Sequence, residues 1–305
     1  MTKSPGGPVG ASLQAIGLML TACLFFSLLD ASSKWVVTHG VDVRFAVWVR
    51  FAGQTLAAFL LFRMWAHPDS WQTKRPVMQI VRALSLALTT SMNFFALQTL
   101  ALIELIAVLF VAPMLVTAVA GPLLGEQVGW RRITAVCVGF IGMLIVIRPG
   151  LDGLKVGHLY AVAAMVSLAA YMLLTRSMNA TETARSLLFW SAVIPAVLAL
   201  PVVPIYGSVP EEPMLLILLC ALGFFGAVGH FLLILAYSRS DISALSPFLY
   251  VQIVWAALLG WIIFEDLPDR WTVVGSAIIV GSGLYIGWRE RQRKVEPPIS
   301  RAPAV

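Results

Sequence analysis

The sequence has little charge for its length. Only 12% of its 305 residues are Asp, Glu, Lys or Arg, and 59% are hydrophobic. A soluble domain of ordinary composition carries about 25% charged residues, and a disordered chain needs low hydrophobicity. The apolar residues fall in runs of about 20, which is the length of a membrane-spanning helix. The net charge of +6 therefore does not indicate a nucleic-acid partner, and the lipid bilayer is the expected surrounding.

Cysteine and the usual catalytic motifs are scarce as well. Cys23, Cys137 and Cys220 lie far apart inside apolar stretches, without the spacing of a metal site or a disulfide framework. The chain has no Gly-rich phosphate loop and no Ser/His/Asp set, and the segments between apolar runs are too short for a soluble active site. We therefore expect no enzymatic activity, no metal, no cofactor and no direct use of ATP.

What the sequence does contain is a series of ten apolar stretches. Their continuous apolar character over about 20 residues predicts helices rather than the alternating strands of a barrel. The first stretch is long for a cleaved signal sequence, so we expect it to be retained. The fold class predicted is an all-α integral membrane protein with ten transmembrane helices, at 12–36, 44–64, 76–99, 102–123, 131–148, 157–176, 185–206, 213–237, 242–264 and 270–288.

The Lys and Arg residues of the connecting segments predict the orientation. If the N-terminal tail, residues 1–11, is cytoplasmic, most of these basic residues fall on the cytoplasmic side, together with the basic tail at 290–305. Basic residues are enriched in cytoplasmic loops. Both termini are therefore expected in the cytoplasm.

An internal repeat divides the chain into two units, residues 12–150 and 151–289. Leu-Leu-Gly-Glu, ending at Glu126, corresponds to Ile-Ile-Phe-Glu, ending at Glu265, although Pro113 corresponds to Gln252. Each unit holds an odd number of spans, so the second must enter the membrane from the opposite side. Such inverted repeats are typical of secondary transporters that alternate access around a central site.

These residues resemble the drug/metabolite transporter superfamily, and within it the ten-helix EamA family. The resemblance covers about residues 12–289. It is carried by Asp30 to Lys34, Trp48 to Arg50, Arg82 followed by Asn93-Phe94-Phe95-Ala96-Leu97, Pro113, and the pair Glu126 and Glu265. It implies a carrier in the bacterial inner membrane that moves small metabolites, often amino acids, through a cavity between two halves.

Charged residues inside the spans mark the expected pathway. A charge near the bilayer centre costs about 2.5–3.5 kcal/mol on insertion scales, so it needs a partner or an aqueous cavity. Asp30 and Lys34 are four residues apart on one helical face and can neutralise each other, and Arg50 reaches a similar depth. The three residues are predicted to form one polar cluster. That cluster either holds the first two helices together or contacts the substrate or a coupling proton.

Other polar and aromatic residues in the spans are candidates with two interpretations each. Arg82, Ser85, Thr89 and Asn93 form a stripe that either lines the cavity or bonds to a neighbouring helix, and Arg82 could also reach headgroups. His230 is either a packing residue beside a glycine row or a pH-sensitive group. Trp48, Tyr171, Tyr237 and Trp255 could form aromatic walls. The substrate-site candidates are Asp30, Lys34, Trp48, Arg50, Arg82, Thr89, Asn93, His230, Ser246 and Tyr250; the structural repeat markers are Pro113, Glu126, Gln252 and Glu265.

The function expected from the sequence is secondary transport of a small polar metabolite by alternating access. Amino acids are the first expectation for the substrate, with efflux as the direction. Uptake of riboflavin-like or S-adenosylmethionine-like compounds is an alternative, because carriers of those compounds in the superfamily look similar in the first-helix Asp/Lys pattern. A channel or a membrane scaffold is the alternative from another class. Proton coupling and oligomeric state stay open.

Overall fold

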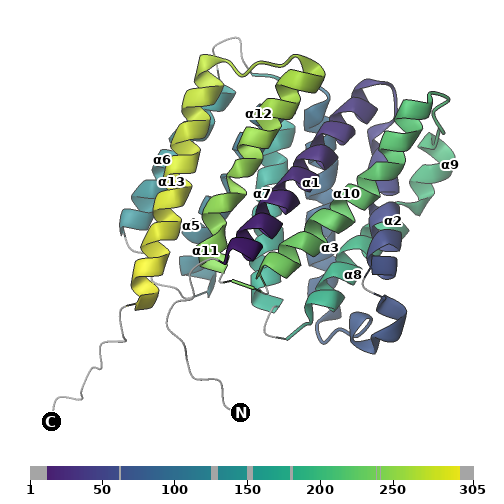
Figure 1. Ribbon diagram of the computed structural model, residues 1–305, viewed down its shortest axis with the longest axis horizontal. Helices are drawn as coiled ribbons and strands as arrows, with labels where there is room; N and C mark the ends of the chain where they lie inside the picture. Colours follow the sequence, from purple (N-terminus) through teal and green to yellow (C-terminus); the bar gives the residue numbers. More distant parts are fainter. Residues whose placement is uncertain are drawn as a thin grey trace.

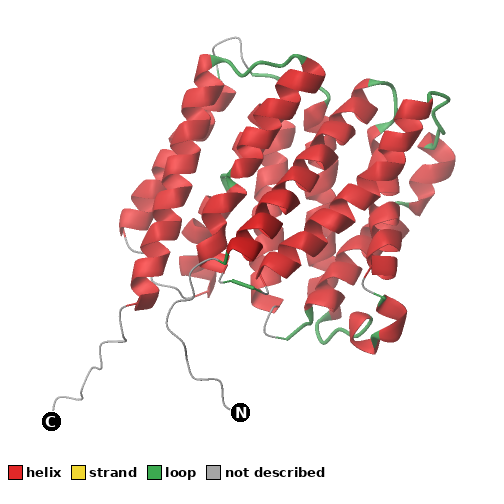
Figure 2. Ribbon diagram, in the orientation of Figure 1, coloured by secondary structure: helices red, strands yellow, loops and turns green. Residues whose placement is uncertain are grey.

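The computed structural model describes residues 12–61, 63–124, 130–149, 154–178, 181–237, 239–240 and 242–295, and every regular element in these ranges is helical (Figure 2). The first unit contains α1 (Leu13–Thr38), α2 (Val43–Leu61), α3 (Pro76–Leu97), α4 (Leu102–Leu109), α5 (Ala112–Leu124) and α6 (Trp130–Ile147), with short helices η1 (Met64–Ala66) and η2 (Pro68–Ser70). The second contains α7 (Val156–Met178), α8 (Ala184–Leu198), η3 (Leu200–Val202), α9 (Val203–Tyr206), α10 (Pro213–Tyr237), α11 (Ile242–Leu249), α12 (Val251–Phe264) and α13 (Arg270–Val295).

The helices confirm the predicted class of membrane protein. Eight helical stretches of the described residues are long and apolar enough to cross a bilayer, and Ile133–Ile147 within α6 is a shorter apolar helix. The remaining predicted span is α2, which carries Arg44 and Arg50. The beginning of α1 and the end of α13 lie at the same end of the bundle, which is the lower end in Figure 1. An even number of crossings requires this arrangement.

Two of the predicted spans are broken in the middle of the bundle. Span 102–123 consists of α4 and α5, and span 242–264 consists of α11 and α12. Pro113, at the start of α5, has no N–H to continue the bonding pattern of α4, which explains the first interruption. Pro247 lies inside α11, three residues before the second interruption. Near the breaks the bonds tighten, from Met114 N to Val111 O at 3.0 Å and from Ile253 N to Tyr250 O at 3.1 Å. The two breaks occupy corresponding positions in the two units.

Helix packing supports the predicted repeat. Helix α1 packs along α10 and α12, while α7 packs along α3 and α5. Helix α2 contacts α10, and α8 contacts α3 in the same way; α2 also meets α8, and α6 meets α13 (Figure 1). In chain order, α1 corresponds to α7, α2 to α8, α3 to α10, α5 to α12 and α6 to α13. Exchanging each helix for its counterpart reproduces these pairs. Two units related by a pseudo-two-fold axis would pack in this manner.

The glycine row of α10 allows the units to approach closely. A Cβ atom at Gly223 would lie 2.6 Å from the backbone nitrogen of Gln54 on α2, and one at Gly229 would lie 2.8 Å from the ring of Phe26 on α1. Glycines spaced along one face in this way let a neighbouring helix approach closely. The contact brings α1 and α2, which carry Asp30 and Arg50, against the second unit.

Replacing Gly223 with alanine should destabilise the protein, because the backbone of α2 would have to move away. We expect a loss of about 1–3 kcal/mol, the usual range for overpacking. Thermal unfolding of the detergent-solubilised protein measures it. Gly281→Ala is the matched control, since a Cβ there meets nothing within 4 Å. Equal melting temperatures for the two variants would contradict the close contact between α2 and α10.

Candidate functional site

A buried polar centre lies where helices from both units meet. The carboxylate of Asp30 on α1 accepts a hydrogen bond from Asn93 Nδ2 on α3 at 3.2 Å and another from Gln252 Nε2 on α12 at 3.4 Å. Arg50 on α2 is also buried and is close enough for its charge to act on Asp30. We call Asp30, Arg50, Asn93 and Gln252 the polar centre. The predicted convergence of Asp30 and Arg50 is therefore observed, and Gln252 is a member as well as a repeat marker.

The polar centre holds more hydrogen-bonding capacity than the described residues satisfy. Arg50 Nη1 and Asn93 Oδ1 are buried and have no hydrogen-bond partner among those residues, and Ser27 Oγ and Gln54 Oε1 share this property. Ser27 precedes Asp30 by one helical turn, and Gln54 follows Arg50 by one turn. No Asp30–Arg50 ion pair within 4.0 Å is found in the described part of the chain. Unpaired buried polar groups cost about 1–3 kcal/mol each, so their clustering indicates a place for a polar ligand or water.

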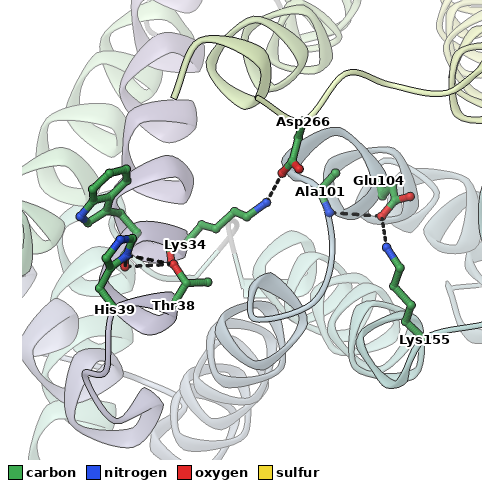
Figure 3. Close-up of polar contacts among 8 residues, drawn as sticks. Lys34, Thr38, His39, Ala101, Glu104, Lys155 and Asp266 are labelled. Atoms are coloured by element: carbon green, nitrogen blue, oxygen red, sulfur yellow. Dashed lines mark hydrogen bonds and ion pairs between the residues drawn. The ribbon is translucent and has the colours of Figure 1, made fainter. Parts of the chain in front are cut away.

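Lys34 does not pair with Asp30, so that part of the prediction was wrong. Its ammonium instead forms an ion pair with Asp266 in the connection between α12 and α13, and it lies 4.6 Å from the ring centroid of Phe264 (Figure 3). Spacing along α1 puts Asp30 and Lys34 on one face, but only the tertiary fold shows which partner each meets. Lys34 therefore lies outside the polar centre.

Among the described residues, three ion pairs at one end of the bundle each join the first unit to the second. Besides Lys34 and Asp266, Arg148 Nη2 lies 2.6 Å from Asp269 Oδ2. Lys155 Nζ lies 3.8 Å from the carboxylate of Glu104, which also accepts a hydrogen bond from Ala101 N at the start of α4 (Figure 3). We call this the ion-pair end; it is the upper end in Figure 1, where α12 connects to α13.

Two carboxyls in the connections at the ion-pair end have lowered pKa values. Partial burial would raise the pKa of Asp269, but hydrogen bonds from Thr272 and the charge and hydrogen bond of Arg148 together lower it. Hydrogen bonding from the Arg44 side chain lowers the pKa of Asp42. Both carboxylates are therefore favoured in the charged form that their partners require.

The polar stripe predicted on the third span divides into separate roles. Arg82 is fully buried and donates to Leu187 O on α8, to Gln79 on its own helix, and to Tyr171 and Thr175 on α7, both at 3.4 Å. It therefore bonds neighbouring helices, and reaches neither headgroups nor the polar centre. Thr89 donates to the carbonyl of Ser85 within α3 at 2.9 Å. Only Asn93 reaches the polar centre.

A cavity of about 330 Å³ lies between helices of both units. Its walls come from α5, α7, α10, α11 and α13. Tyr250 is the substrate-site candidate among the lining residues, and the repeat marker Pro113 lines the cavity as well. Tyr237, expected as an aromatic wall, also lines it. Sequence analysis missed Phe110, Met114, Thr117, Met172 and Arg176. The available signal was their position near Pro113 or on the helix that carries Tyr171.

The remaining candidates have structural contacts or lie outside the described residues. Trp48 Nε1 donates to Ala196 O on α8 at 3.1 Å, which bridges α2 and α8. His230 packs edge-on against Phe26 at 5.1 Å, which favours the packing interpretation. Exposed Glu265 ends α12 in a left-handed conformation (φ 56°), and no ion pair with Arg270 is found where the chain is described. Glu126 and the side chain of Ser246 are outside the described part of the structure.

Replacing Arg82 with alanine should destabilise the protein, because acceptors on α7 and α8 would lose a charged donor in a buried setting. We expect a loss of about 1.5–3 kcal/mol. Thermal unfolding and the yield of monodisperse protein measure this loss. Arg75→Ala removes an exposed arginine from the start of the same helix and is the control. If Arg82→Ala melts like the parent protein, the hydrogen bonds of Arg82 do not hold these helices together.

Comparison with known proteins shows the class of activity. Residues 155–288 match the EamA-like transporter family. The chain is 30% identical to an S-adenosylmethionine uptake transporter of Rickettsia felis, over 92% of this chain and 94% of the relative. It is 27% identical to a riboflavin transporter of Rhizobium johnstonii, over 92% of each. A solved crystal structure at 18% identity shares the fold, with a TM-score of 0.64 and coverage of 93% of this chain and 99% of the other. The chain belongs to the EamA-like transporter family.

Proposed function

We propose that this transporter imports a zwitterionic nucleoside sulfonium compound of the S-adenosylmethionine type across the bacterial inner membrane. The relative at 30% identity is named as an uptake transporter for that compound, and the match covers nearly the whole length of both chains. The relatives therefore favour the uptake alternative over amino-acid efflux, the first expectation from the sequence. The methionine part of S-adenosylmethionine is itself an amino acid, because it carries an ammonium and a carboxylate.

The observation that carries the proposal is the polar centre. Asp30 and Arg50 are buried charges of opposite sign without a direct ion pair, and Arg50 Nη1 has no partner among the described residues. An ammonium fits the carboxylate of Asp30, and a carboxylate fits the planar donors of Arg50. A zwitterion between them would supply the missing contacts.

The two ends of the bundle support alternating access. At the ion-pair end, three pairs hold the units together above the polar centre. The 330 Å³ cavity extends from Phe110 and Tyr250, at the helix breaks, toward Arg176 and Tyr237 near the other end. In this proposal, transport opens the ion-pair end while the units close around the cavity. Rocking of inverted repeats around a fixed site produces such a cycle.

The distribution of basic residues supports an inward-facing arrangement. At the ion-pair end, Lys34, Arg44, Arg148 and Lys155 each have a carboxylate partner. The opposite end carries an excess of basic side chains, namely Arg63, Lys74, Arg75, Arg176, Arg185, Arg239 and Arg289. Because basic loops stay in the cytoplasm, we place that end and both termini there. The cavity then extends toward the cytoplasm.

Radiolabelled S-adenosylmethionine should enter proteoliposomes that contain the parent protein, and Asp30→Asn should raise the KM by about tenfold or more. The expected size follows from losing a charge-assisted contact worth about 1.5–3 kcal/mol. Asp69→Asn is the control, because this carboxylate sits in the connection between α2 and α3, where it pairs with Arg185 at 3.5 Å. The proposal fails if the parent protein carries riboflavin or amino acids but no adenosyl compound.

The ion pair between Lys34 and Asp266 should respond to exchange of its charges. Lys34→Asp leaves two carboxylates facing each other, so the closed state at that end loses stability and uptake should fall about tenfold. The double variant Lys34→Asp, Asp266→Lys should recover most of the rate in the same uptake assay. If the double variant is no faster than the single one, the pair does not help to close that end.

A further inference from the structure

The cavity between the two units has one charged side chain, that of Arg176, among the residues that line it. Its walls are mainly apolar, with the thioethers of Met114 and Met172 and the rings of Phe110 and Tyr250 among them. A volume of about 330 Å³ falls within the range of small-molecule sites, which are typically lined by apolar and aromatic groups with a few polar ones. The part of a substrate that fits here is flat and apolar.

The helix breaks place two aromatic rings at the mid-bundle end of this cavity. Phe110 follows α4 in the first unit, and Tyr250 separates α11 from α12 in the second. Their ring centroids are 5.0 Å apart and their planes meet at 36°. Both side chains are half-buried. Each unit therefore contributes one ring from the same level of the fold, although the two broken spans are far apart in sequence.

Tyr250 is held in this position by close packing against α13. Its hydroxyl lies against Gly283, where even a Cβ atom would overlap it. In the described part of the chain this hydroxyl has no recorded hydrogen-bond partner. The ring is thus fixed in orientation, and its hydroxyl remains able to bond to a heteroatom of a ligand.

The aromatic pair lies at nearly the same depth in the bundle as the polar centre. Gln252, which donates to Asp30, follows Tyr250 by two residues, or about 3 Å of helical rise. Because residues two apart leave a helix about 200° apart, a ligand with a charged amino-acid end and a flat ring end must reach past the chain at the α11–α12 break to occupy both places. Neither place alone accounts for the chemistry of such a ligand.

We propose that Phe110 and Tyr250 form a subsite for a planar fused-ring heterocycle, which selects the ring end of the substrate while Asp30 and Arg50 bind its charged end. This inference rests on the proposed function for the identity of the charged end. Stacking on an aromatic side chain contributes about 1–3 kcal/mol per base and tolerates different rings. A purine and a flavin can both stack in this way. S-adenosylmethionine and riboflavin, the compounds in the names of two relatives, each contain one of these rings.

The test uses probes that separate the two ends of the substrate. 5′-Methylthioadenosine has the purine without the amino acid, S-methylmethionine has the sulfonium amino acid without the ring, and riboflavin has a different fused ring. Binding of each probe to the full chain in nanodiscs is measured by isothermal titration calorimetry. Tyr250→Leu should weaken 5′-methylthioadenosine by about tenfold or more, with S-methylmethionine changed by less than about twofold. Tyr250→Phe retains the ring and should keep most of the affinity for 5′-methylthioadenosine. This variant distinguishes loss of the ring from a general packing defect at the position.

The fold offers a matched control in a second aromatic pair. Phe95 and Tyr160 have centroids 5.3 Å apart and an interplanar angle of 33°, between α3 and α7 and away from the cavity lining. Tyr160→Leu removes the same chemical group and should leave the affinity for all three probes unchanged. The subsite is overturned if Tyr250→Leu binds 5′-methylthioadenosine like the parent protein, or if it weakens both adenine and amino-acid probes equally.

Failure of the subsite and failure of the proposed function give different results. If the parent protein imports S-adenosylmethionine and Tyr250→Leu leaves ring binding unchanged, the subsite is wrong and the function stands. If the parent protein binds riboflavin but neither adenine nor amino-acid probe, the proposed substrate is wrong. In that case, loss of riboflavin binding in Tyr250→Leu still supports the subsite.

Discussion

Two buried charges of opposite sign that do not neutralise each other directly lie at the centre of the structure. In a medium of low dielectric constant, the charges of Asp30 and Arg50 are costly unless other groups stabilise them. Asn93 and Gln252 stabilise the carboxylate in part, and Arg50 keeps an unpaired donor. A packed membrane protein has little reason to maintain such an arrangement for stability alone. A zwitterionic ligand would complete it.

The rest of the fold positions and isolates this centre. Glycines of α10 allow α1 and α2 to pack against the second unit, so the two charged side chains meet in the interior. The ion pairs at one end connect the two units, and the helix breaks at mid-bundle bring Phe110 and Tyr250 into contact. The polar and aromatic groups therefore occupy separate places at a similar depth, although Gln252 and Tyr250 belong to the same broken span. A carrier that recognises a charged end and a flat end of one molecule needs this separation.

Much of the fold could be predicted because membrane helices have a strong local signal. Length and apolar character located the spans, and the matching sequence patterns that end at Glu126 and Glu265 indicated the repeat. Asp30 and Arg50 were recognisable because a charge in hydrocarbon requires a reason. The partner of Lys34 was not predictable in this way, since Asp266 reaches it only through the α12–α13 connection. The cavity wall at Phe110 was also missed, because one apolar ring within an apolar span carries no distinguishing signal until the helix break is known.

The central claim is that Arg50 recognises a substrate carboxylate opposite Asp30. The most direct measurement compares the affinities of S-adenosylmethionine and its decarboxylated form in the parent protein and in Arg50→Gln. We predict that the parent protein prefers the intact compound by about tenfold or more and that the preference disappears in Arg50→Gln, since a charge-assisted bond contributes about 1.5–3 kcal/mol. An equal preference in both proteins would show that the carboxylate is bound elsewhere and would contradict the account.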